Sequence, residues 1–149
     1  MIVRQRAKTW SAVALAVSVL LFAGRLMAQD SFTGSFAGQQ RTQHPWIGTF
    51  CWCPPGEFTM GEKNDPRGNA RQVDVKITRG FWMGNYEVTQ AQYEFVMKEN
   101  PSQFRGAFLP VEMVRWTEAT EYCEKLTALA LEHNQLPMGL EFRLPTEAQ

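Results

Sequence analysis

The stretch Gly80–Met97, GFWMGNYEVTQAQYEFVM, sets an aromatic strand directly before a capped helix. Its first part, Phe81–Val88, is extended and apolar and is predicted to lie deep in a sheet, with a glycine marking a bulge or a close backbone approach. The hydroxyl of Thr89 can cap the helix that follows, and Gln92, three residues on, can reach back to the same turn. We therefore predict a strand and then a helix that ends near Lys98.

Three shorter segments upstream of this stretch also have the composition of strands. Val73–Thr78 alternates branched apolar and polar residues, which predicts a half-buried strand. Phe50–Cys53 and Glu57–Met60 flank the turn signal Pro54–Gly56, and this arrangement predicts a hairpin. Residues 61–71 are rich in charge and are expected to form a surface loop.

A second helix is predicted after a short extended segment that ends at Trp116. Thr117 is the expected cap, and the apolar residues that follow are spaced as one helical stripe. The residues of this stripe are Ala119, Tyr122, Cys123, Leu126, Leu129 and Ala130. Cys123 is therefore expected to point inward, where a thiol behaves as a small hydrophobic group.

The last residues combine a strand pattern with the start of another helix. Phe142–Leu144 alternates like a strand, and Thr146 and Gln149 repeat the spacing of a cap and its returning side chain. A single capped turn is unstable without a following helix, because the first turn fixes several residues for only one hydrogen bond. The local pattern predicts a domain that continues beyond the sequence given.

The N-terminal residues have the outline of a signal peptide. Three basic residues precede an apolar run from Trp10 to Gly24, which is shorter than the roughly 20 residues needed to cross a bilayer. We expect cleavage after Ala28, so that residues 1–28 are the leader. The alternative is an uncleaved membrane anchor, which Arg25 before the cleavage site favours. In both cases the rest of the chain is expected to be exported to the periplasm or the extracellular space.

Removal of the leader takes away four basic residues and leaves 11 basic and 15 acidic ones, a formal charge of −4. A mildly acidic chain without a lysine or arginine cluster does not favour nucleic acid or a membrane surface as a partner. Residues 29–45 are rich in Gly, Ser, Gln and Thr and predict a flexible linker, so the domain is expected to span residues 46–149.

Three cysteines follow the leader, which leaves at least one of them without a partner in the chain. Cys51 and Cys53 stand two apart on a predicted strand and therefore share a face, a poor arrangement for bridging each other. With a thioether from Met60 or Met83 they could hold copper(I), because that ion prefers soft sulfur ligands. Packing, or a disulfide to another segment, is the favoured interpretation.

The order of motifs resembles the formylglycine-generating-enzyme or sulfatase-modifying-factor family. The matching pieces cover nearly all of the chain from Trp52 onward. They are WCPPGEFTMG (Trp52–Gly61), GFWMGNYEVTQAQYEFVM (Gly80–Met97), NPSQF (Asn100–Phe104), LPVEMVRW (Leu109–Trp116), EYCEKL (Glu121–Leu126) and FRLPTEAQ (Phe142–Gln149).

This resemblance implies an α+β fold with little regular secondary structure, distantly similar to C-type lectin domains. Catalytic members of the family use a reactive cysteine pair, copper(I) and molecular oxygen to oxidise a sulfatase cysteine to formylglycine. The cysteine pair and the calcium-binding loops of the family lie downstream of the motif at which this sequence ends. The resemblance also implies that Cys123 can form a disulfide with a cysteine of that downstream part.

Other candidate side chains have a structural interpretation that is favoured over a catalytic or metal-binding one. His44 and His133 are each isolated, so neither is expected to bind a metal. Glu87 is expected to be partly buried and paired with an arginine, whereas Glu94, Glu112 and Glu121 show no acid–base pattern. The aromatic residues that could line a groove are expected to be core residues first: Trp82, Tyr86, Tyr93 and Trp116.

We therefore assign no catalytic, cofactor-binding or metal-binding residue to this sequence. We also assign it no cofactor, because the resemblance implies that copper and calcium are bound only by residues after Gln149. Two functions remain open. The chain is either the leading part of an exported formylglycine-generating enzyme, inactive alone, with a sulfatase or another protein as substrate, or a non-catalytic binding module of the same fold.

Overall fold

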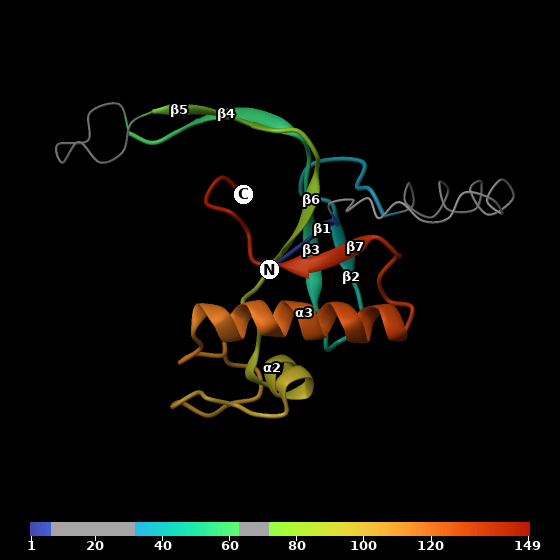
Figure 1. Cartoon of the computed structure of the whole chain (residues 1–149), viewed down its shortest axis with the longest axis vertical. Helices are drawn as coiled ribbons and strands as arrows, with labels where there is room; N and C mark the ends of the chain where they lie inside the picture. The colour runs from blue at the N-terminus through green and yellow to red at the C-terminus, as the bar shows by residue number, and fades with distance from the viewer. Residues whose placement is uncertain (7–31, 63–71) are drawn as a thin grey trace, which may run out of the picture.

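The computed structural model describes residues 1–6, 32–62 and 72–149 of the chain (Figure 1). Within this part it contains two helices and two antiparallel sheets, so the α+β class is confirmed. The strands are β1 (Ile2–Gln5), β2 (Gln40–Thr42), β3 (Thr49–Cys53), β4 (Gly56–Met60), β5 (Val73–Ile77), β6 (Phe81–Gly84) and β7 (Leu140–Arg143). The helices are α2 (Gln90–Met97) and α3 (Trp116–Glu132).

The larger sheet has the strand order β2-β3-β6-β1-β7, and every neighbouring pair in it is antiparallel. Its register places Trp52 of β3 opposite Trp82 of β6, and Val3 of β1 opposite both Trp82 and Phe142 of β7. Directly opposed residues share a face, so these four side chains project from the same side of the sheet.

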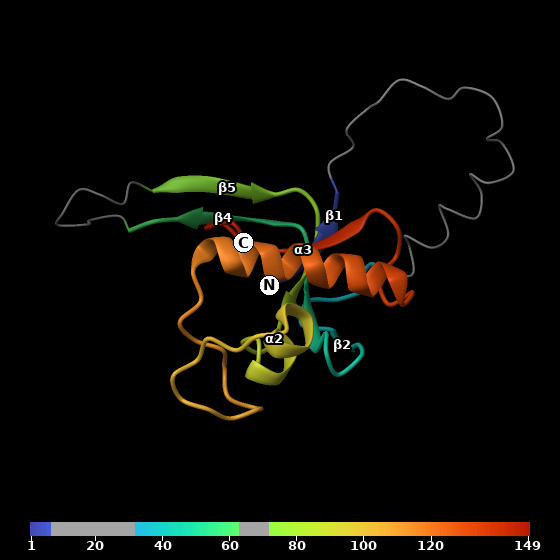
Figure 2. The same ribbon diagram turned by 60° about the horizontal axis from the view of Figure 1, so that its bottom comes forward.

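Helix α3 crosses this apolar face, and α2 lies on the far side of α3 (Figures 1 and 2). Leu126 and Ala130 of α3 are fully buried, and Cys123 points inward as the stripe predicted. Thr127 joins the helix to the sheet, because its hydroxyl donates to the Cys123 carbonyl at 2.8 Å and accepts the Phe142 amide at 2.9 Å. Apolar burial and this hydroxyl together hold α3 against β7.

Helix α2 begins with a capping box where the sequence predicts it, whereas α3 has only the returning half of such a box and begins earlier than predicted. Thr89 and Gln92 form the predicted reciprocal bonds at the start of α2, and Lys98 ends that helix in the left-handed conformation. Helix α3 begins at Trp116 rather than after Thr117. Its cap is Arg115, whose side chain accepts no backbone amide; the backbone amide and the guanidinium of Arg115 both donate to the Glu118 carboxylate instead.

The predicted hairpin between Phe50–Cys53 and Glu57–Met60 is wrong. Strand β3 pairs with β2 and β6 in the larger sheet, while β4 pairs with β5 in a separate two-stranded ribbon. Two prolines lie between β3 and β4, and the chain there passes from one sheet to the other instead of folding back. The half-buried strand expected at residues 73–78 is β5 of this ribbon, and its Val73 side chain is 52% exposed.

Two segments outside the predicted domain belong to the sheet. The segment expected to be a linker contains β2 and the buried Phe32, whose ring meets Trp82 edge on at 6.3 Å. Residues 2–5, which the sequence places in a leader, form β1 between β6 and β7. The apolar run from Trp10 to Gly24 lies outside the described residues. None of the helices in the described ranges has both the length and the apolar character needed to cross a membrane.

The final residues form a single turn. The backbone amide of Gln149 donates to the Thr146 carbonyl at 3.1 Å, and the side-chain oxygen of Gln149 accepts the backbone amide of Thr146 at 3.3 Å. The returning side chain predicted from the spacing is therefore present.

Candidate functional site

A groove of about 700 Å³ opens between the sheet and the base of the β4–β5 ribbon. We call it the basic groove, because Arg4, Lys76 and Arg79 line it and none of its described lining residues is Asp or Glu. Its apolar wall includes aromatic rings from three separate segments: Phe32, Trp52, Phe81 and Trp82. A concave cavity of this size, with aromatic rings and a few charged groups in its lining, is typical of a ligand site.

The three cations of the basic groove differ in whether a nearby carboxylate balances their charge. Lys76 Nζ lies 2.5 Å from the Glu57 carboxylate, and Arg4 Nε lies 3.4 Å from that of Glu141. Arg79 instead donates to the neutral side-chain oxygen of Gln5 at 3.1 Å. The charge of Arg79 is therefore the one most available to an anionic ligand.

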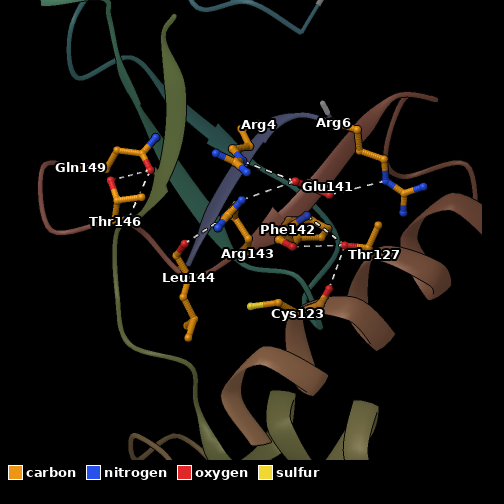
Figure 3. A network of polar contacts seen from close by, with 10 residues as sticks. All are labelled: Arg4, Arg6, Cys123, Thr127, Glu141, Phe142, Arg143, Leu144, Thr146 and Gln149. Carbon is orange, nitrogen blue, oxygen red and sulfur yellow. Dashed lines mark hydrogen bonds and ion pairs between the residues drawn. The ribbon is translucent and has the colours of Figure 1, made fainter. Parts of the chain in front are cut away.

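Three arginines surround the carboxylate of Glu141 at the edge of this region (Figure 3). Arg4 lies 3.4 Å, Arg6 3.7 Å and Arg143 4.0 Å from it. Two of these arginines come from the first six residues of the chain and one from β7 itself. Glu141 thus ties the N-terminal segment to the edge of the sheet.

Cys51 and Cys53 lie on the face of β3 opposite to Phe50 and Trp52, as their spacing predicts, and both are half-buried. Burial is the main cause that raises the pKa of the Cys53 thiol, and the neighbouring Cys51 raises it further through its charge and a hydrogen bond. Met83 stands directly across from Cys51, whereas Met60 lies at the far end of the ribbon. Of the two thioethers considered as copper ligands, the structure brings only Met83 to this face.

Burial also raises the pKa of the Cys123 thiol, to about 11. Cys51, Cys53 and Cys123 are all free thiols. At neutral pH a thiol with a raised pKa stays protonated, and it is then a poor nucleophile and a poor metal ligand. Within the described ranges no three His, Cys, Asp or Glu side chains are grouped so as to hold a metal ion.

The two histidines are closer than the sequence suggests. His44 and His133 flank the same indole, with ring centroids 5.3 Å and 5.9 Å from that of Trp46. Phe95 of α2 stacks on this indole at 5.5 Å. Trp46 therefore joins the segment before β3, helix α2 and the end of α3.

The glutamates considered as acid–base groups are either exposed or engaged in contacts that stabilise the fold. Glu87 is exposed, and none of the ion pairs between described residues includes it, so the expected buried pair with an arginine is wrong. Glu112 accepts the backbone amides of Gln103 and Phe104, which orders a loop. Glu121 pairs with Lys125 one helical turn away at 2.8 Å.

The aromatic residues considered for a groove divide into two pairs. Trp82 and Tyr93 are buried core residues, as predicted, and Trp82 also lines the basic groove. Tyr86 and Trp116 are 78% and 72% exposed, so the expectation that they belong to the core is wrong.

Sequence reasoning missed Gln90, which is only 1% exposed and organises the loop after α2. Its amide donates to the Phe104 and Pro110 carbonyls at 2.7 Å and 3.2 Å. Its oxygen accepts from Asn100 Nδ2 at 3.0 Å and from the Gly106 amide at 3.1 Å. A glutamine in the first turn of a helix carries no signal of this role, because its partners lie 10 to 20 residues away.

The cations of the basic groove were also missed. Arg4, Lys76 and Arg79 come from two strands and a turn, so they form no cluster in the sequence. Only the fold brings the turn after β5 close to β1, where Arg79 donates to Gln5.

Comparisons with known proteins agree with this fold. Chaperone protein LppX of Paenibacillus barcinonensis is 47% identical over 57 residues, which cover 38% of this chain and 19% of that protein. The structure of PvdO from Pseudomonas aeruginosa superposes with a TM-score of 0.55 at 18% identity, over 64% of this chain and 46% of the other. The chain thus spans less than half the length of either relative.

The family match is broader than either of these pairwise matches. Residues 36–149 match the sulfatase-modifying factor enzyme 1-like domain, and this range includes β2 through β7 and both described helices. The match covers well over half of the chain, and it agrees with the motif order from Trp52 onward. The chain therefore belongs to the sulfatase-modifying factor enzyme 1-like domain family.

Proposed function

We propose that this chain is the scaffold and ligand-facing part of an exported sulfatase-modifying-factor-type domain, and that it does not itself oxidise a substrate cysteine. The observation that carries the proposal is the state of the thiols. Burial raises the pKa of both Cys53 and Cys123, the opposite of what activates a catalytic cysteine.

The position of Cys123 supports the same conclusion. It is 3% exposed and lies on the face of α3 that is tied to β7 through Thr127. A protein substrate reaches such a thiol only if the helix separates from the sheet. A structural thiol suits this position better than a reacting one.

In this proposal, formylglycine formation belongs to longer members of the family. The resemblance implies that the cysteine pair, the copper and the calcium sites are supplied by residues after the motif that ends at Gln149. A sulfatase or another protein would then be the substrate of the longer protein. Export is supported by the basic and apolar pattern of residues 1–28.

The test is a direct assay for aldehyde. The purified chain is incubated with a peptide that contains Cys-x-Pro-x-Arg, copper(I), oxygen and a thiol reductant, and the peptide is then labelled with a hydrazide and weighed by mass spectrometry. We expect no more labelled peptide than with the matched variant Cys51→Ala/Cys53→Ala/Cys123→Ala. Aldehyde formed by the natural chain and not by this variant would show that the proposal is wrong.

A binding module is the second candidate, and the basic groove favours it. While residues 1–6 are in place, the groove has the size of a ligand site, three cations and an aromatic wall that includes Trp52 and Trp82. Its charge favours an anionic ligand and disfavours a basic peptide. The two proposed functions are compatible, because a binding scaffold can also be part of a longer enzyme.

Tryptophan fluorescence can test the binding role, since two indoles line the groove. An acidic peptide such as hexaglutamate is titrated into the chain and into Arg79→Gln. We expect the apparent affinity to fall by roughly tenfold in the variant, because one charge-assisted contact contributes about 1.5 kcal/mol. Equal binding by the variant, or equal binding of hexalysine, would exclude the groove as an anion site.

A further inference from the structure

The place of β1 in the sheet conflicts with the pattern of its sequence. Residues 1–6 begin a segment that looks like a removable leader, yet Ile2–Gln5 separate β6 from β7. Within the described sheet, β7 pairs with β1 alone. A chain that loses its leader therefore loses the strand that joins β7 to the rest of the sheet.

The slot between β6 and β7 holds an extended strand, which pairs over four residues with β7 and over two with β6. On one side the β1 register runs from Ile2 opposite Arg143 to Gln5 opposite Leu140, and on the other Ile2 and Val3 stand opposite Met83 and Trp82. Backbone bonds close both ends. The Gly84 amide donates to the Met1 carbonyl at 2.9 Å, and the Arg6 amide donates to the Gly139 carbonyl at 2.8 Å.

The side chains of β1 in the slot are two buried apolar residues followed by an arginine. Ile2 and Val3 are 0% and 2% exposed and, as consecutive residues of a strand, point to opposite faces of the sheet, so each face of the slot buries an apolar side chain. Arg4 and Arg6 then meet the Glu141 carboxylate (Figure 3). Main-chain bonds supply affinity in such strand addition, and the side-chain pockets supply specificity.

We propose that the slot between β6 and β7 is a strand-acceptor site for an extended segment with two apolar residues followed by arginine. The first six residues of the chain occupy it before the leader is removed. Cleavage of the leader then exposes two strand edges and the Glu141 carboxylate to a segment of the same pattern. Unpaired edges of this kind are sites of strand addition.

The experiment uses the full chain with a site-specific protease sequence inserted between Thr9 and Trp10, folded before it is cut. The probe is a fluorescent peptide of residues 1–9, Met-Ile-Val-Arg-Gln-Arg-Ala-Lys-Thr, and binding is followed by anisotropy. The control peptide carries Ile2→Lys and Val3→Lys. We expect the cut chain to bind one equivalent of the probe, the uncut chain to bind none because its own β1 fills the slot, and the control peptide to bind at least tenfold more weakly.

The cleaved fragment of residues 1–9 can stay in the slot and exchange only slowly with the probe. Mass spectrometry of the cut chain after gel filtration shows whether this fragment is retained. Retention of residues 1–9 without a covalent link supports the proposal even if the probe does not enter. If the cut chain aggregates, the cut is repeated with excess probe, and solubility restored by the probe but not by the control peptide supports it equally. Loss of the fragment without probe binding, aggregation that the probe does not prevent, or equal binding by cut and uncut chain would overturn it.

Discussion

Strands β3 and β7 of the five-stranded sheet and strand β5 of the β4–β5 ribbon have similar alternating sequences but opposite surroundings. In the sheet, Phe50 and Trp52 of β3 are 2% and 8% exposed, whereas in the ribbon Phe58 and Val73 are 43% and 52% exposed. Helix α3 covers one face of the sheet, while the ribbon leaves the sheet at the end remote from both helices (Figure 1). Alternation therefore predicts that a strand forms, and a second layer decides whether its apolar face is buried.

The two regions also differ in what holds them together. Across the ribbon, Glu57 pairs with Lys76 at 2.5 Å, and the Thr59 hydroxyl donates to Asp74 at 2.9 Å, both in exposed positions. A two-stranded ribbon of this kind is marginally stable alone. We therefore expect substitutions of equal chemistry to be costly in the sheet and nearly neutral in the ribbon.

The largest expected difference is between two phenylalanines. Phe142 of β7 is 3% exposed and packs on Phe50 at 5.9 Å, so Phe142→Ala should lower the free energy of unfolding by about 3–5 kcal/mol. Phe58→Ala in the ribbon is its control and should cost less than about 1 kcal/mol. Urea unfolding followed by tryptophan fluorescence measures both. Equal losses would mean that the ribbon is as well covered as the sheet.

The pH dependence of stability tests how well α3 and the sheet bury the Cys123 thiol. Its pKa in the folded chain is about 11, above the ordinary value of 9.0, so the unfolded chain releases this proton first as pH rises. The contribution of the protonated Cys123 thiol to the free energy of unfolding is fully present below pH 9 and is lost between about pH 9 and 11. The size of that loss is on the order of 2 kcal/mol.

Unfolding in reductant from pH 8 to 11, compared between the natural chain and Cys123→Ala, isolates this contribution. We expect the stability of the two proteins to converge as pH rises, because the variant lacks the titrating group. A constant difference across the range would show that Cys123 has the same pKa in both states.

Two glycines give a smaller contrast. A Cβ on Gly80 would lie 2.2 Å from Cζ2 of Trp52 and 3.0 Å from the Cys53 carbonyl, whereas one on Gly56 of the ribbon meets nothing within 4 Å. Gly80→Ala should therefore lower stability by about 1–3 kcal/mol, and Gly56→Ala by less than about 0.5 kcal/mol. Thermal unfolding of both variants measures the difference. A neutral Gly80→Ala would show that Trp52 moves freely at this position.

The smallest effect is expected for the ribbon ion pair. Glu57 and Lys76 have side chains that are each 68% exposed, so Glu57→Gln should change stability by less than about 0.5 kcal/mol. Urea unfolding at low and high salt checks this value. A larger loss that disappears in salt would mean that the pair stabilises the ribbon more strongly than its exposure suggests.

The sequence alone determined the features that depend on near neighbours. Thr89 and Gln92 form the predicted capping box because both partners lie within one turn. The stripe through Cys123 and Leu126 is buried because helical spacing places these residues on one face. The family follows from motifs that are each local in the chain.

Only the tertiary structure decided which distant segments meet. The basic groove, the shared indole between His44 and His133, and the pairing of β1 with β7 all join residues that sequence spacing does not relate. The same holds for β3 and β4, which the sequence pairs and the fold separates. The physical reason is that strand pairing is non-local: many partners satisfy the same backbone bonds, and burial against α3 selects among them.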